Sequence, residues 1–88
     1  MSADPELERL REQVSAVDGA IIDAFNRRLE LVAQIKRHKD EHGIAFVDPE
    51  REQWMFGHQA QSNRGPLTDE GLRTLYAELL ALTKRELG

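Results

Sequence analysis

The chain has 88 residues, no cysteine and a formal net charge of −4, which suits one small domain over residues 1–88 and excludes a disulfide framework or a thiolate metal site. Its basic and acidic residues are interspersed, unlike the basic face of a nucleic-acid-binding protein, and no segment resembles a signal peptide or a membrane span. We therefore expect a soluble, cytoplasmic protein that contacts neither nucleic acid nor membrane.

The first predicted helix covers about residues 5–41. It opens at Asp4-Pro5, an N-cap followed by proline at the first helical position. Positions spaced alternately by three and four then form a heptad seam, in which Arg28 is the one charged member. The register passes Asp18-Gly19 without a slip, which favours one continuous helix over a turn. The apolar seam positions are Leu7, Leu10, Val14, Val17, Ile21, Ala24, Leu31 and Ile35.

Two shorter helices are predicted after it. The segment "VDPERE" starts a helix over about 49–62, with Asp48 as the N-cap and acidic residues in the first turn. Thr68 is the N-cap of a third helix over about 68–87, which carries apolar residues on one face. No alternating strand pattern occurs, so the expected fold is all-α, with three helices per chain.

The length of the first helix predicts a dimer. A helix over 5–41 would be about 55 Å long, whereas a compact globule of this chain length is only about 30 Å across. The helix must extend beyond any core that one chain can build, and its apolar seam then needs a second chain to cover it. We expect an antiparallel helical homodimer around a two-fold axis, the simplest arrangement that covers the seam.

The basic residues of this helix could form a binding site. Arg28 and Lys39 lie about 16 Å apart on one side of the helix and could hold a small molecule between them. Arg11 is about 25 Å from Arg28 and could join only from an antiparallel partner chain. Each residue alone also has a structural explanation: Arg28 could pair with Glu30 or Glu12, and Lys39 suits the helix dipole.

Three segments together resemble the all-helical (AroQ-type) chorismate mutases. The resemblance covers the chain from Leu7 to about Leu87 and implies an isomerase that converts chorismate to prephenate in phenylalanine and tyrosine biosynthesis. It also implies that the chain forms an intertwined antiparallel helical homodimer and needs no metal or cofactor. The segments are "LREQVSAVD" with Arg11, "RRLELVAQIKRHK" with Arg28 and Lys39, and "VDPERE" with Asp48, Arg51 and Glu52.

The resemblance also implies a role for each residue. Arg28 and Arg11 of the partner subunit bind the two carboxylates of chorismate, to which guanidinium forks are suited. Lys39 directs its ammonium group at the ether oxygen, and Glu52 accepts a hydrogen bond from the ring hydroxyl. The remaining wall of the site consists of Asp48 and Arg51.

The third helix departs from the family pattern. The family usually has a small polar residue there, followed four positions later by a Gln or Glu that donates to the ether oxygen. The apolar pattern around Tyr76 places Thr83 and Leu87 at these positions, and Leu87 cannot donate; an ungapped count gives Lys84 and Gly88 instead. We expect either a weak mutase or one completed by a pathway partner enzyme or a fused catalytic domain.

Two other functions are compatible with the sequence. An isochorismate pyruvate-lyase would share the fold and much of the basic set, although "DPERE" with Glu52 is more typical of the mutases. A non-catalytic helical module, which binds an aromatic-pathway metabolite or docks on a partner enzyme, would bind chorismate without turnover or not bind it at all.

Restoring the missing donor tests this alignment. The substitution Leu87→Gln should raise kcat for chorismate, because one donor to a developing oxyanion is typically worth about 10²- to 10³-fold in rate. Steady-state kinetics would measure the gain. An unchanged kcat in a variant with an otherwise intact site would contradict the alignment.

Overall fold

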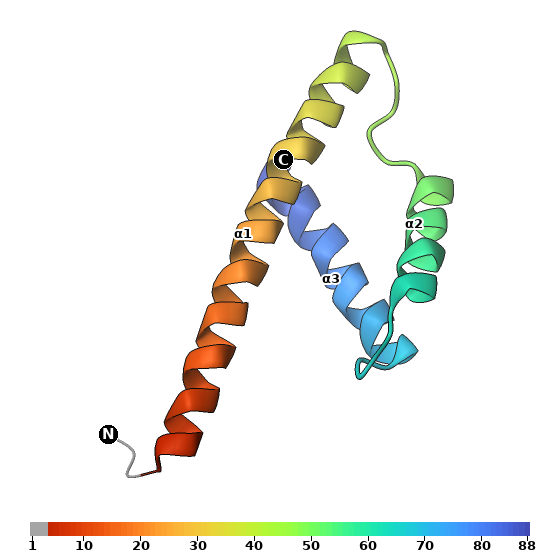
Figure 1. Ribbon diagram of the computed structural model, residues 1–88. Coiled ribbons are helices and arrows are strands. Elements are labelled where there is room, and N and C mark those ends of the chain that lie inside the picture. Colours follow the sequence, from red (N-terminus) through yellow and green to blue (C-terminus); the bar gives the residue numbers. More distant parts are fainter. Residues whose placement is uncertain (1–3) are drawn as a thin grey trace. The chain divides into compact units, whose positions relative to one another are not determined.

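The computed structural model describes residues 4–88, which form three helices (Figure 1). These are α1 (Pro5–Glu41), α2 (Pro49–Ser62) and α3 (Asp69–Leu87). No strand occurs within residues 4–88, and none of the helices there is long and apolar enough to cross a membrane. The predicted all-α fold with a long first helix is therefore confirmed.

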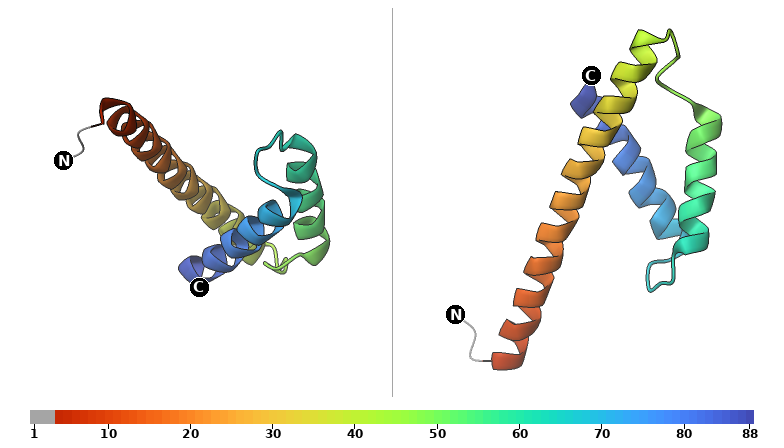
Figure 2. Two further views of the ribbon diagram at one scale, coloured as in Figure 1. Left: turned by 90° about the horizontal axis from the view of Figure 1, so that it is seen from below. Right: turned by 45° about the horizontal axis from the view of Figure 1, so that its top comes forward.

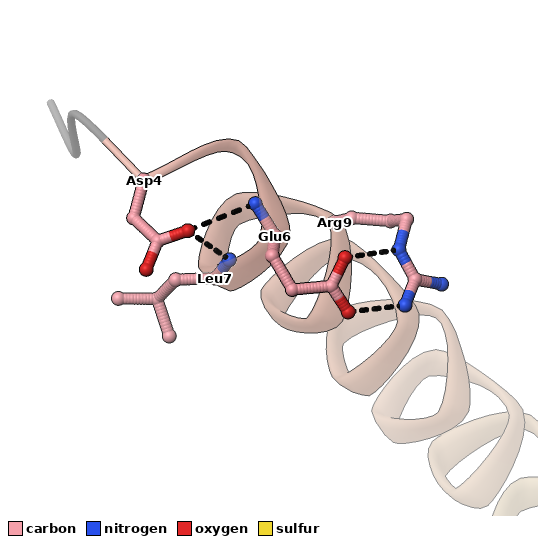
Figure 3. Close-up of polar contacts among 4 residues, drawn as sticks. All are labelled: Asp4, Glu6, Leu7 and Arg9. Atoms are coloured by element: carbon pink, nitrogen blue, oxygen red, sulfur yellow. Dashed lines mark hydrogen bonds and ion pairs between the residues drawn. The ribbon is translucent and has the colours of Figure 1, made fainter.

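Helix α1 is continuous over 37 residues, so the chain does not turn back at Gly19. Figure 3 shows its beginning, where Asp4 Oδ1 accepts hydrogen bonds from the backbone N–H groups of Glu6 at 3.0 Å and Leu7 at 3.2 Å. One turn on, Arg9 Nε donates to Glu6 Oε2 at 3.0 Å. Hydrogen bonding to Arg9 holds the pKa of the Glu6 carboxyl below its ordinary value.

The chain divides into two compact units, Met1–Gln34 and Ile35–Gly88. The first unit contains most of α1, a helix without a single buried residue. The seam is open along its length, and Val17 and Ile21 remain 57% and 61% exposed. The apolar residues that the sequence assigns to an interface are therefore exposed on α1.

The second unit contains the end of α1 together with α2 and α3. Gly43 follows α1 with a φ of 65°, in the left-handed region that favours glycine. The N–H of Ile44 then donates to the carbonyl of Lys39 at 2.8 Å, which closes the helix in a Schellman arrangement. The predicted end of the helix before Gly43 is therefore confirmed.

Helices α2 and α3 run in opposite directions and are joined by a loop (Figures 1 and 2). At the start of α3 the side chain of Thr68 accepts a hydrogen bond from Gly71 N at 3.0 Å, as expected of an N-cap. Between the helices, Phe56 meets Tyr76 edge-on at a centroid distance of 6.4 Å. Among the described residues, only Tyr76 and Thr83 are buried.

A lysine fastens the end of α3 to the last turns of α1. Lys36 Nζ donates to the carbonyl of Leu87 at 2.8 Å, and the same ammonium group lies 5.6 Å from the ring centroid of Phe46. A cation at the C-terminal end of a helix is favoured by the helix dipole and by the unpaired carbonyl groups there. This contact fixes the C-terminal part of α3 within the second unit.

The hydroxyl of Tyr76 generates a prediction about stability. It is buried and forms no hydrogen bond with any group within residues 4–88. Because an unpaired polar group loses its hydration on burial, Tyr76→Phe should leave the free energy of unfolding unchanged or raise it by up to about 1 kcal/mol.

Urea denaturation at one fixed chain concentration would measure this change. The control Tyr76→Ala removes the ring as well and should cost about 3 kcal/mol or more. A loss of about 1 kcal/mol or more in the phenylalanine variant would show that the hydroxyl has a partner and would contradict the prediction.

Candidate active site

The start of α2 carries three of the expected site residues, Asp48, Arg51 and Glu52. Asp48 is the N-cap of the helix, and its Oδ1 accepts the backbone N–H of Arg51 at 3.1 Å. Pro49 occupies the first turn, where its missing N–H is no loss. The cap predicted from the sequence is therefore confirmed, and one oxygen of the Asp48 carboxylate is committed to it.

Glu52, one turn into α2, forms an ion pair with α3. Lys84 Nζ lies 2.9 Å from Glu52 Oε1, and the two side chains are 44% and 30% exposed. The family resemblance implies that Glu52 accepts a hydrogen bond from the substrate hydroxyl. Lys84 entered the sequence analysis only as an alternative position for the small polar residue of the family pattern. The contact joins residues far apart in the sequence, so no local spacing rule could have predicted it.

Lys39 is held beside the loop that follows α1. Its side chain is half-buried, and Nζ donates to the carbonyl oxygen of Phe46 at 3.2 Å. An ammonium group has three donors, so this hydrogen bond orients Lys39 and leaves donors for a ligand. Lys36, three residues earlier, shares the same surroundings through its contact with the Phe46 ring.

Arg51 lies in a different environment from Glu52. Its guanidinium stacks over the ring of Trp54 at 4.2 Å, and Trp54 in turn stacks on His58 with centroids 5.0 Å apart. Such a stacked cation stabilises an exposed aromatic side chain. A shallow pocket on this part of α2 is lined by Gln53, Trp54, Gly57, His58 and Gln61, and none of these is an expected site residue.

The end of α3 contains the two positions at which the family pattern is altered. Thr83 is 4% exposed, and its hydroxyl donates to the carbonyl of Leu79 at 2.6 Å. Leu87 is half-buried, and its carbonyl accepts the hydrogen bond from Lys36.

The two expected arginines of α1 belong to the first unit. Arg11 is exposed, and its Nη1 lies 3.3 Å from Glu8 Oε1, an exposed pair of the kind that contributes little to stability. Arg28 is half-buried. Glu30, one of its possible partners in the sequence, forms an ion pair with Arg27 at 3.3 Å.

The second unit thus holds Lys39, Glu52 and Thr83 by contacts that fix their positions, and it adds Lys84 as a partner of Glu52. These side chains supply two cations, one carboxylate and one hydroxyl. Within residues 4–88 no cluster of His, Asp or Glu has the geometry to hold a metal ion. These groups can bind anions and accept one hydrogen bond.

Comparisons with known proteins agree with this chemistry. A family model described as chorismate mutase type II matches residues 10–86. The solved structure of chorismate mutase (form I) from Thermus thermophilus is similar with a TM-score of 0.86 and 32% sequence identity, over 89% of this chain and 98% of that one.

Curated relatives add two further names. The 4-amino-4-deoxychorismate mutase of Streptomyces venezuelae is 39% identical over 51 residues, or 58% of this chain and 50% of that protein. A bifunctional chorismate mutase/prephenate dehydratase of Stutzerimonas stutzeri is 29% identical over 86 residues, or 92% of this chain and 24% of that protein. The chain therefore spans half or less of the length of these two relatives.

Proposed function

This chain belongs to the chorismate mutase type II family, and we propose that it catalyses the rearrangement of chorismate to prephenate, a step toward phenylalanine and tyrosine. The observation that carries the proposal is the family match over residues 10–86, which includes every expected site residue except Leu87. The names of the matched proteins support a mutase over a lyase or a non-catalytic module.

The reaction needs little from the protein in chemical terms. Chorismate is a dianion, and its rearrangement is intramolecular, without proton transfer, nucleophile or metal. Catalysis consists of holding the folded conformer and stabilising the negative charge that grows on the ether oxygen as its bond to carbon breaks. Even a modest enzymatic acceleration requires about 8 kcal/mol of preferential binding to the transition state.

Three residues of this chain suit these tasks. Arg28 is half-buried, so its guanidinium would meet a substrate carboxylate with less screening than at a fully exposed position. Lys39 is oriented by the Phe46 carbonyl and would stabilise the charge on the ether oxygen. Oε1 of Glu52 forms the ion pair with Lys84, so Oε2 would accept the hydrogen bond from the ring hydroxyl.

Three more residues would complete the wall. Asp48 would act through its position at the start of α2, since one of its carboxylate oxygens is already used by the cap. Arg51 would have to leave its stack on Trp54 to reach a substrate. Thr83 is buried on α3, and its hydroxyl would have to turn away from the Leu79 carbonyl to position a substrate carboxylate.

The active form would be a homodimer. The exposed seam of α1 needs a cover, and an antiparallel second copy would supply both that cover and a second guanidinium, from Arg11 of the partner subunit. This arrangement concentrates positive charge at the site although the chain as a whole has a net charge of −4.

A further protein could supply the hydrogen-bond donor to the ether oxygen that Leu87 cannot provide. The S. stutzeri relative is named as a bifunctional enzyme, a chorismate mutase and a prephenate dehydratase. We propose that a pathway enzyme, fused or associated, improves a site that is weak in the isolated chain. A cytoplasmic location would fit such a biosynthetic step.

A second candidate substrate is 4-amino-4-deoxychorismate. The observation that favours it is the 39% identity to the S. venezuelae mutase named for it. In this compound an amino group replaces the hydroxyl at ring position 4, and the two carboxylates and the ether oxygen would be bound as in chorismate. Chorismate remains the first candidate because the family as a whole is described by it.

Removing the central guanidinium tests the proposed function. Arg28→Ala should lower kcat/KM for chorismate by about 10²-fold or more, because a charge-assisted, bidentate contact to the substrate is lost. The fall in chorismate absorbance would be followed with purified protein, and circular dichroism would verify the helical content.

The matched control is Arg27→Ala. Arg27 is the neighbouring residue, and both side chains of its ion pair with Glu30 are exposed. Arg27→Ala therefore removes the same charge from the solvent-facing side of the helix and should change kcat/KM by less than about threefold. Full activity in the Arg28 variant, or an equal loss in both variants, would contradict the assigned site.

A further inference from the structure

The ion pair between α2 and α3 places a cation on the carboxylate that would recognise ring position 4 of the substrate. Lys84 Nζ is 2.9 Å from Glu52 Oε1, at the distance of a charge-assisted hydrogen bond. Lys84 directly follows Thr83, one of the two buried residues among those described. The backbone that carries this cation therefore lies next to a buried position of α3, and the ion pair directs its ammonium group at Glu52.

A carboxylate that carries an ammonium partner discriminates between ligands differently from a free one. Its second oxygen still accepts a hydrogen bond, because an ionised carboxylate offers about four lone-pair positions. A neutral hydroxyl requires only this acceptor. The binding of a cationic ligand group depends in addition on its attraction to the negative charge of Glu52. The positive charge of Lys84 offsets that attraction.

The two candidate substrates differ in this respect. Chorismate presents a neutral hydroxyl at ring position 4, whereas its amino counterpart presents an amine, and alkyl amines are protonated at neutral pH. The protonated amine would meet Glu52 together with the ammonium group of Lys84, and two like charges at close range repel each other.

We propose that Lys84 determines specificity: by holding Glu52, it selects substrates with a neutral hydroxyl at ring position 4 against those with a protonated amine there. The inference rests on the proposed function of the same site. Lys84 acts through the charge of Glu52 and needs no contact of its own with the reacting atoms.

A purely structural role for the pair makes a different prediction. Both side chains are partly exposed, and exposed ion pairs often do no more than connect two helices weakly. If Lys84 only fastened α3 to α2, its removal would loosen the site for every ligand. The rates with the two substrates would then fall by the same factor, and their ratio would not change.

The test compares kcat/KM and Kd for chorismate and for 4-amino-4-deoxychorismate in four proteins. These are the unaltered chain, Lys84→Met, Lys84→Arg and the control Arg85→Met. The control removes a positive charge from the adjacent, exposed position of the same helix. Circular dichroism and size-exclusion chromatography would verify that each variant is folded and keeps its oligomeric state.

The unaltered chain should prefer chorismate by about tenfold or more in kcat/KM. Lys84→Met should reduce this preference by about tenfold, chiefly through a gain with the amino substrate. Lys84→Arg keeps a cation on Glu52 and should retain the preference, as should Arg85→Met. A preference that is the same in Lys84→Met as in the unaltered chain would overturn the inference.

Failure of the proposed function would look different. In that case the unaltered chain would neither bind nor rearrange either compound, and the inference about Lys84 would be overturned with it. If both compounds react and only their ratio is insensitive to Lys84→Met, the mutase function stands and the specificity role is wrong. If Lys84→Met does not fold, loss of the chorismate preference in Lys84→Arg would overturn the inference as well.

Discussion

The uncovered apolar seam of α1 is the constraint on which the rest of the molecule depends. The helix extends over 37 residues without a buried side chain, and the chain as described buries only Tyr76 and Thr83. Burying one exposed Val, Leu or Ile contributes about 1.5–3 kcal/mol, so covering the seam would supply free energy of the same order as the whole stability of a small domain. A second copy of the chain is the proposed cover.

The same constraint connects folding with catalysis. A dianionic substrate needs several cations close together, and one acidic chain of this size has few places to gather them. Helical spacing puts Arg11 about 25 Å from Arg28 on α1, so an antiparallel partner is the route by which both could face one ligand. Dimerisation would then cover the seam and complete the site in a single event.

The sequence predicted the helices well because their signals are local. Asp48 and Thr68 act as the expected N-caps, Pro49 lies in the first turn of α2, and Gly43 follows the end of α1. The continuity of α1 followed from an unbroken three-four spacing around Gly19. Each of these features is decided by residues within a few positions of one another.

The contacts between helices could not be predicted in this way. The pair of Glu52 with Lys84 depends on how α2 and α3 cross, and the bond from Lys36 to the Leu87 carbonyl depends on where α3 ends beside α1. The stack of Arg51 on Trp54 could have been predicted from the sequence, because residues three apart on a helix are neighbours. The roles of the site residues remain predictions.

Subunit complementation tests the shared site most directly. Arg11→Ala and Arg28→Ala chains would be prepared separately, mixed in equal amounts, left to exchange and assayed with chorismate. If each site combines Arg28 of one chain with Arg11 of the partner subunit, half of the dimers will be mixed and one of their two sites intact, so activity should return to about a quarter of the unaltered level. Two folded variants that exchange subunits and stay as inactive together as apart would contradict the account.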